Sequence, residues 1–202
     1  MYVPPAFRED RTEVLHAAIR AVRLPVLIGT GPDGLIASHV PMLLDAAAGP
    51  LGTLIGHVAR ANPHTQTIGE ALAIFQGPDA YITPSWYPTK QETGKVVPTW
   101  NYVAVHAAGT VEWFTDPARL LDIVTRLTNR FEAARAKPWA VSDAPTDYVA
   151  AHMQGIVGFA LTITKLEGKW KMSQNRAPAD RAGVVAGLAA DGRADIAGLI
   201  AP

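Results

Sequence analysis

The sequence predicts a mainly β protein in which an antiparallel sheet or barrel is flanked by peripheral helices. Segments with strand-like alternation recur through the middle of the chain, and Gly- and Pro-containing turns, rather than helices, connect them. The one Gly-x-Gly-x-x-Gly match, Gly29 to Gly34, falls in a turn between two expected strands and opens no helix, and the chain has no phosphate-loop signature, which disfavours a parallel βαβ fold. These observations favour about seven or eight strands.

Length and composition set limits on function. The 202 residues are enough for one substantial domain, and we expect a single domain over 1–202 with a helical extension at 178–202. Eighteen Lys and Arg balance eighteen Asp and Glu, so no net positive charge attracts nucleic acid or an anionic membrane. The absence of Cys excludes disulfides, thiolate zinc sites, iron–sulfur clusters and cysteine nucleophiles.

The first ten residues carry prolines and charges where a signal peptide needs an apolar core. No uninterrupted apolar run in the sequence approaches the length that a membrane span requires. We therefore expect a cytoplasmic protein without a membrane segment.

The first half of the chain predicts one long helix followed by strands. Asp10 and Glu13 form a capping pair for a helix that ends near Arg23, before Pro25. Asn62-Pro63 is the cap of a second, short helix. The expected strands cover 25–28, 35–44, 51–58, 71–76 and 80–87, with turns at 30–34 and 77–79 and a loop at 88–98.

The second half adds three helices and the remaining strands. Asp116-Pro117 begins the clearest helix, because apolar residues repeat at helical spacing from Leu120 to Phe131. This helix is expected to continue to about residue 136. Further helices are expected at 146–154 and from Pro178 onward, and further strands at 97–112, 157–163 and 168–173.

The stretch 97–112 has more polar side chains than a core strand needs. Alternation places Trp100, Tyr102, Ala104 and His106 on one side, and Asn101, Val103, Val105 and Ala107 on the other. The row of Trp, Tyr and His is suited to one wall of a site for a flat aromatic ligand. The alternative is a β core whose polar tips are hydrogen-bonded.

Two further segments carry candidate ligand groups. His57 and Arg60 precede the helix cap Asn62-Pro63, where free amides and a guanidinium form a reasonable phosphate site; the alternative is a simple cap. The segment 169–176 concentrates lysines, an arginine, a hydroxyl and amides at the end of a strand; the alternative is a solvated edge.

Metal and triad chemistry have little support. The histidines His39, His57, His64 and His106 include no pair with helical ligand spacing, and no Cys accompanies them. A Ser-His-Asp triad from Ser85, His106 and Asp79 lacks a nucleophile elbow. No metal site is predicted.

Several blocks of sequence stand in a fixed order along the chain and cover 1–4 with Phe7, 37–41, 56–57 with 62–63, 75–82, 85–87, 97–102, 155–159 and 171–176. Together they resemble the PaiB-like family, described as FMN-binding negative transcriptional regulators and related to flavin split barrels of the pyridoxamine-phosphate-oxidase type. The insert 88–96 and the tail after Ala189 carry no such block.

This resemblance implies a six-stranded antiparallel split barrel and a homodimer with FMN at the subunit interface. It implies a flavoprotein, with flavin-dependent redox activity if the protein is an enzyme. One alternative is a transcriptional regulator in which FMN is only a sensor or structural ligand. The other is a haem-binding split barrel with His39, His57 or His106 as axial ligand. The sequence shows no helix-turn-helix or basic recognition helix that supports direct DNA binding. The expected cofactor-binding residues are Ser38, His39, His57, Arg60, Asn62, Trp100, Asn101, Lys171, Ser173, Gln174 and Arg176.

Overall fold

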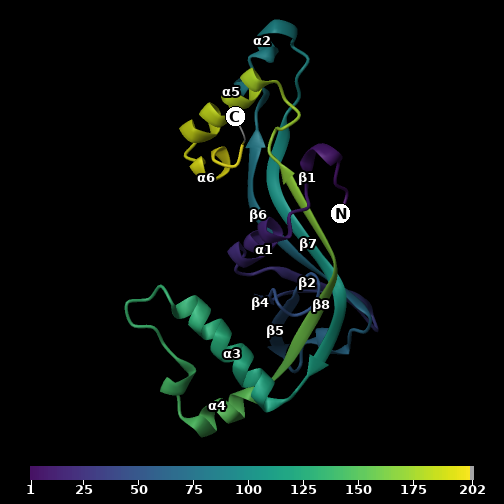
Figure 1. The fold of residues 1–202 in the computed structure, drawn as a ribbon, viewed down its shortest axis with the longest axis vertical. Helices are drawn as coiled ribbons and strands as arrows, with labels where there is room; N and C mark the ends of the chain where they lie inside the picture. The colour runs from purple at the N-terminus through teal and green to yellow at the C-terminus, as the bar shows by residue number, and fades with distance from the viewer. Residues whose placement is uncertain (201–202) are drawn as a thin grey trace. The chain divides into compact units, whose positions relative to one another are not determined.

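The structure is a computed structural model that describes residues 1–200, and it has the mainly β class that the sequence predicts. The strands are β1 (Arg8–Glu9), β2 (Val26–Gly31), β3 (Gly34–His39), β4 (Met42–Asp45), β5 (Thr53–Ala59), β6 (Glu70–Ile82), β7 (Thr99–Phe114) and β8 (Ile156–Lys171). The α-helices are α1 (Thr12–Ala21), α2 (Thr89–Thr93), α3 (Pro117–Glu132), α4 (Thr146–Met153), α5 (Pro178–Ala190) and α6 (Ala194–Ala197), all labelled in Figure 1. Four short 3₁₀ helices join them: η1 (Pro5–Phe7), η2 (Pro63–Gln66), η3 (Pro84–Trp86) and η4 (Val141–Asp143).

The strands form one sheet in the order β3-β2-β6-β7-β8-β5-β4, with β1 paired to β8. Every pair whose register is defined is antiparallel. The sheet has eight strands in residues 1–200 rather than the six that the resemblance implies, because the short strands β1 and β4 are added beside β8 and β5. None of the helices in this part of the chain has the length and apolar character needed to cross a bilayer.

The predicted turn at 77–79 is wrong, because β6 continues through it. The register between β2 and β6 covers only Leu72, Ala73 and Ile74, so Pro78, which has no N–H to donate, lies beyond that paired part. Gly77 is needed for packing, since a Cβ there would lie 3.0 Å from Val103. Long-range pairing therefore overrides the local preference of Gly-Pro-Asp for a turn.

The predicted break between 163 and 168 is also wrong, because β8 is one strand. Gly168 pairs with Glu9 of β1, and a Cβ at this position would lie 2.2 Å from Leu15. This glycine permits close packing rather than a turn. Conversely, the strand expected at 35–44 divides into β3 and β4 around Val40 and Pro41, and the expected loop at 88–98 contains α2, which ends at the left-handed Gly94.

The chain divides into two compact units. Unit 1 contains Met1–Leu15, Gln76–Val105 and the chain from Glu167 onward, and unit 2 contains His16–Phe75 and His106–Leu166. A single domain over 1–202 stays a prediction. Residues 201–202 of the expected extension 178–202 lie outside the described residues.

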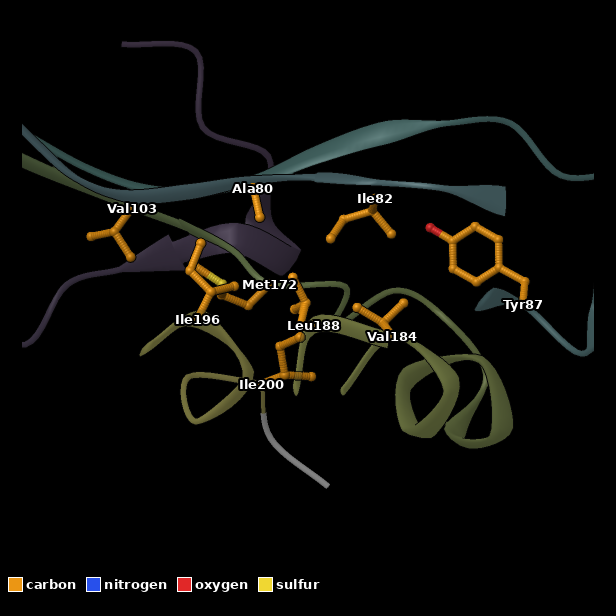
Figure 2. Close-up of a cluster of buried hydrophobic side chains, with 9 residues drawn as sticks. All are labelled: Ala80, Ile82, Tyr87, Val103, Met172, Val184, Leu188, Ile196 and Ile200. Carbon is orange, nitrogen blue, oxygen red and sulfur yellow. The ribbon is translucent and has the colours of Figure 1, made fainter. Parts of the chain in front are cut away.

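The core of unit 1 is formed where α5 and α6 pack on strand side chains. Figure 2 shows the nine buried members of this α5 cluster: Ala80, Ile82, Tyr87, Val103, Met172, Val184, Leu188, Ile196 and Ile200. The hydroxyl of Tyr87 points into the cluster, on the side of Ile82. The helix that begins at Pro178 is therefore confirmed, and its apolar face is buried.

The core of unit 2 includes the face of the sheet that α3 covers. Ile123 and Leu127 of α3 pack with Leu43 of β4, and Ile55 and Phe114 adjoin them. Asp116 caps this helix as predicted, since its carboxylate accepts from the N–H of Arg119 at 2.9 Å. The helix ends at Glu132, four residues before the predicted end at 136.

Candidate functional site

In unit 1, the start of β7 and the end of β8 lie side by side. Asn101 Nδ2 lies 3.0 Å from Ser173 Oγ, and that hydroxyl lies 3.2 Å from Asn101 Oδ1. Both side chains are buried. Two of the three blocks that the sequence singled out, 97–106 and 169–176, are thus brought together.

The turn after β8 is held by its own side chains. Ser173 has φ of 61°, and it is the one non-glycine residue with a positive φ in residues 1–200. Gln174 accepts from the N–H of Met172 at 2.7 Å and donates to the carbonyl of Trp170 at 2.6 Å. The predicted ligand residues Asn101, Ser173 and Gln174 therefore use their polar groups to shape this turn, and direct contact with a cofactor stays a prediction.

Lys171 carries its ammonium group back to the beginning of β7. Its Nζ donates to Oγ1 of Thr99 and to the carbonyl of Trp100, the latter at 2.7 Å. Burial, together with repulsion from Lys169 and Arg176, lowers the pKa of Lys171. Its acceptors are neutral, so they orient the cation without compensating its charge.

Lys169 and Arg176 complete a group of three cations, the unit 1 cation cluster, with Lys171. Lys169 donates to the carbonyl of Tyr2 at 3.1 Å, and its Nζ lies 5.1 Å from the ring centre of Tyr102. The guanidinium of Arg176 lies 4.8 Å from the ring centre of Tyr87. No carboxylate forms an ion pair with any of the three within the described chain. The cluster therefore keeps an uncompensated positive charge.

An exposed aromatic pair adjoins this cluster. Trp100 is 53% exposed and Tyr81 is 49% exposed, and their ring centres lie 5.9 Å apart at an interplanar angle of 70°. Burial along β7 agrees with the predicted alternation, because Asn101 and Val103 are buried while Trp100 is open. The indole thus presents free aromatic surface on the same residue whose backbone carbonyl accepts from Lys171.

In unit 2, three polar side chains form a chain of hydrogen bonds. Asn62 Oδ1 accepts from the backbone N–H of His64 at 2.9 Å, so the amide nitrogen of Asn62 faces Ser38 and donates to its hydroxyl at 3.1 Å. Ser38 Oγ lies 2.9 Å from His64 Nδ1. The Ser38 hydroxyl can therefore link the amide of Asn62 to the imidazole of His64, as donor or acceptor according to which ring nitrogen carries the proton.

The last group in this series of hydrogen bonds, the imidazole of His64, has one ring nitrogen without a partner. His64 is 0% exposed, and its Nε2 has no hydrogen-bond partner. The indole Nε1 of Trp113, whose ring centre is 6.3 Å from that of His64, also lacks an acceptor. Burial lowers the pKa of His64 from its ordinary value of 6.5, which keeps the ring neutral.

His57 lies on the other face of the sheet from this chain. A Cβ at Gly56 would meet the ring of Phe159, which contacts Trp113, whereas a Cβ at Gly158, the partner of His57 across β5 and β8, would meet Phe114. Because neighbouring residues alternate faces, His57 points to the α3 side. Its Nδ1 is buried without a partner, and burial lowers its pKa.

Arg60 and His39 complete the predicted set in unit 2. Arg60 donates to the carbonyls of Gln154 at 2.6 Å and Ile156 at 3.4 Å, which fastens the connection between α4 and β8. His39, at the end of β3, is exposed. Neither arrangement tests a contact with a phosphate, so these roles stay predictions.

Residues outside the predicted site set prove central to both groups. The sequence indicates His64 only as a candidate metal ligand, although its position two residues after the cap Asn62 is a signal that it lies close to that side chain. Lys169 and Tyr81 stand in segments that the sequence singled out, but nothing local indicates that they face a shared surface. Across residues 1–200, no group of three or more His, Asp and Glu side chains is placed to hold a metal ion.

The antiparallel sheet with peripheral helices is the split-barrel fold that the sequence predicts. The chain belongs to the family described as “Putative FMN-binding domain”, whose model matches residues 1–165. Membership in this family assigns FMN as the cofactor. The matched range ends before Lys171, so the last predicted block lies outside it.

Sequence relatives extend over most of the chain. An uncharacterized protein of Emericella nidulans is 35% identical over 226 aligned residues, which cover 93% of this chain and 90% of the relative. The Bacillus subtilis protease synthase and sporulation protein PAI 2 is 29% identical over 188 residues, covering 92% of this chain and 87% of that protein. The resemblance to the PaiB-like family is thereby confirmed.

Solved structures share the fold at low identity. A conserved hypothetical protein from Mycobacterium tuberculosis has a TM-score of 0.59 at 12% identity, covering 88% of this chain and 94% of that one. An FAD- and haem-binding protein from Mycobacterium smegmatis has a TM-score of 0.57 at 16% identity, covering 81% and 73%. At these identities the likeness concerns the fold alone.

The donor set of unit 1 fits FMN. The cofactor combines a flat tricyclic ring with a phosphate, and these parts call for an aromatic surface and uncompensated cations respectively. Trp100 offers the first, and Lys171 and Arg176 offer the second. In unit 2, the hydrogen-bonded side chains Asn62, Ser38 and His64 end at a buried ring nitrogen without a partner, and His64 itself is closed to the surface.

Proposed function

We propose that this protein is an FMN-dependent oxidoreductase that works as a homodimer. The observation that carries the proposal is the placement of Trp100 beside the unit 1 cation cluster. A half-exposed indole next to cations without carboxylate partners is poorly explained by stability alone, because the like charges repel one another. A flat ligand with a phosphate relieves that repulsion and covers the indole.

In this proposal, Trp100 packs against the ring system, while Lys171 and Arg176 bind the phosphate. Thr99 and the carbonyl of Trp100 hold the ammonium of Lys171 in place. Asn101, Ser173 and Gln174 support the turn that positions Lys171 and Arg176. Bound FMN supplies reversible hydride and electron transfer, and the residues contribute binding, orientation and electrostatics.

The unit 2 residues of the predicted site are proposed as additional contacts. Ser38 and Asn62 are partly exposed and belong to the hydrogen-bond chain that ends at His64. His39 is exposed at the end of β3. In a homodimer, such contacts can come from the same or the partner subunit, which the resemblance to interface-bound flavin proteins supports.

Titration of the purified protein with FMN, followed by visible absorbance and by quenching of flavin fluorescence, tests the cofactor site. Trp100→Ala and Lys171→Met should each raise the Kd for FMN by about tenfold, which corresponds to about 1.4 kcal/mol. Trp139→Ala and Lys137→Met are the matched controls, since both residues are exposed, and both variants should keep the original Kd. An unchanged Kd in both site variants would remove the proposal.

Turnover separates the oxidoreductase from the regulator. Reduction of the bound flavin by a nicotinamide nucleotide, with reoxidation by a defined acceptor, supports the enzyme. Retention of a specific DNA duplex at high salt, without flavin turnover, supports a regulator in which FMN is a sensor or structural ligand.

Haem binding is a second candidate, and one observation favours it. Of the histidines proposed as axial ligands, His39 is exposed, whereas His57 has its Nδ1 buried under α3. Titration with haem should then give a Soret band that His39→Ala removes. A Soret band that persists in this variant, or none at all, excludes His39 ligation.

A further inference from the structure

A second cationic site lies in unit 2, and none of the residues that line it belongs to the proposed flavin site. It is a cavity of about 410 Å³, the arginine pocket, which is lined by Arg20, Leu43, Leu44, Arg126, Asn129 and Arg130. Its walls come from the end of α1, from β4 and from the C-terminal half of α3. A cavity of this size falls within the range that holds small organic ligands.

Helical spacing directs the α3 residues into this cavity. Arg126, Asn129 and Arg130 stand at positions i, i+3 and i+4, so they share one helix face. Two arginines and an amide on one face, opposite the arginine of α1, supply many N–H donors and only one side-chain acceptor. This composition is suited to an anion.

Arg130 is fixed by neutral acceptors. Its Nη1 donates to the carbonyl of Met42 at 3.0 Å, and its Nη2 donates to the carbonyl of Arg20 near the end of α1. These contacts explain why Arg130 is partly buried, but they leave its charge uncompensated. Burial, and repulsion from Arg20 and Arg23, lower the pKa of Arg130.

The balance of charge around the pocket is positive. Arg126 has a carboxylate partner, Asp122 at 3.2 Å, and both side chains of this pair are substantially exposed. No acidic residue lines the cavity itself. The dipole of α1 accounts for arginines near its C-terminus, but it does not account for their meeting the arginines of α3 around a concavity.

The floor of the pocket is apolar. Leu43 and Leu44 both line the cavity. They are neighbours on β4 and point to opposite faces, and Leu43, which packs with Ile123 and Leu127 of α3, is the one on the side of the arginines. A bare inorganic anion uses only the guanidinium groups, whereas an ester with a ring or an alkyl group also contacts this apolar lining. We propose that the arginine pocket binds a small organic phosphate monoester, as a site separate from the flavin site.

Calorimetric titration with AMP as the probe tests this site, on the full-length protein that has been loaded with FMN and then freed of excess FMN, because FMN is itself a phosphate monoester and would compete with AMP. Arg20→Gln and Arg126→Gln should each weaken AMP binding by about tenfold, the usual effect of losing a charge-assisted contact. Both changes leave the hydrogen bonds of Arg130 intact, because Arg20 accepts from Arg130 through its backbone carbonyl and not through its side chain. Arg135→Gln, an exposed arginine of the same unit, is the control and should bind AMP unchanged.

Inorganic phosphate and a DNA duplex serve as the comparison probes. Binding of AMP that is stronger than binding of phosphate supports the role of the leucine floor, whereas equal affinity overturns it. The proposal is also overturned if AMP gives no saturable binding, if both site variants bind as the unchanged protein does, or if only the duplex responds to the variants. Lys171→Met should weaken FMN but not AMP, so failure of the flavin site does not imply failure of this one.

Discussion

Asn101 and Ser173 hydrogen-bond to each other across the ends of β7 and β8, and they do so at a point where the backbone of Ser173 is left-handed. A serine in this conformation is disfavoured relative to glycine. The buried amide of Asn101 offsets that cost by providing both a donor and an acceptor for the serine hydroxyl. This pair therefore holds the turn from which Lys171 and Arg176 extend.

Asn101→Ala and Ser173→Ala should each lower the free energy of unfolding by about 1–3 kcal/mol, because each leaves a buried polar group unpaired. The double variant should be less destabilised than the sum of the two, since the second change removes a group that has already lost its partner. Urea denaturation measures both quantities. Asn175→Ala, at an exposed neighbour, is the control, and additive effects of the two changes would contradict the coupling.

Ser173→Gly separates backbone conformation from hydrogen bonding. Glycine accepts a φ of 61° without strain, so this variant should be more stable than Ser173→Ala although both lack the hydroxyl. The comparison uses the same urea midpoints. A glycine variant that is no more stable than the alanine variant would show that the left-handed conformation carries no cost here.

Acid should destabilise the protein through His57 and His64. Burial lowers the pKa of both from the ordinary value of 6.5, so below that pH the unfolded chain binds more protons than the folded protein. The contribution of these two histidines to the free energy of unfolding is therefore fully present above pH 6.5. It falls as the pH decreases towards the lowered pKa values. Urea midpoints measured across this range check the direction.

His57→Leu should reduce this pH dependence without loss of stability at neutral pH, because the imidazole Nδ1 is buried without a partner. His39→Leu removes an exposed imidazole instead and should leave the slope unchanged. Equal slopes for His57→Leu and the unchanged protein would refute the assignment to His57.

The contact between Gly187 and Trp86 should be sensitive to a single methyl group. A Cβ at Gly187 would lie 2.3 Å from the indole of Trp86, so Gly187→Ala forces α5 and η3 apart. We expect a loss of roughly 1–3 kcal/mol in unfolding free energy, although alanine is the better helix former. Gly198→Ala, whose new Cβ would come no closer than 3.4 Å to other atoms, should cost nothing. Thermal melts of the two variants decide the point.

Two exposed apolar side chains in unit 2 mark a surface for the proposed dimer. Leu35 of β3 is 81% exposed and Ile68, just after η2, is 86% exposed, and β3 and η2 contact each other. Leu35→Asp combined with Ile68→Asp should shift the protein to monomer in light-scattering chromatography, because both charges would be buried in the interface. Leu24→Asp, at another exposed leucine, is the control. A dimer that survives the double change places the interface elsewhere.

Much of the fold follows from local patterns. The faces of β7 were predictable because side chains alternate along any extended strand, which separates Trp100 from Asn101. Asp116-Pro117 and Pro178 indicated the starts of α3 and α5 because capping and proline act within a single turn. The FMN resemblance depended on blocks whose order along the chain is itself a property of the sequence.

Local patterns failed where a distant segment decided the outcome. Gly77-Pro78-Asp79 has the composition of a turn, yet β6 continues through it. The sequence could not show that His57 and His64 have different surroundings, because those surroundings depend on which face of the sheet α3 covers. The arginine pocket joins residues of α1 and α3 that stand about a hundred positions apart.

By itself, the sequence determined the β class, the helix starts, the absence of cysteine chemistry and the family, because each of these depends on local spacing or on motif order. The tertiary structure alone decided which partners the polar groups have: Nε2 of His64 has none, and the charged groups of Lys171 and Arg130 donate only to neutral oxygens. Whether a charge or a donor finds a partner depends on neighbours brought in by long-range strand pairing and helix packing, and local sequence does not specify those neighbours.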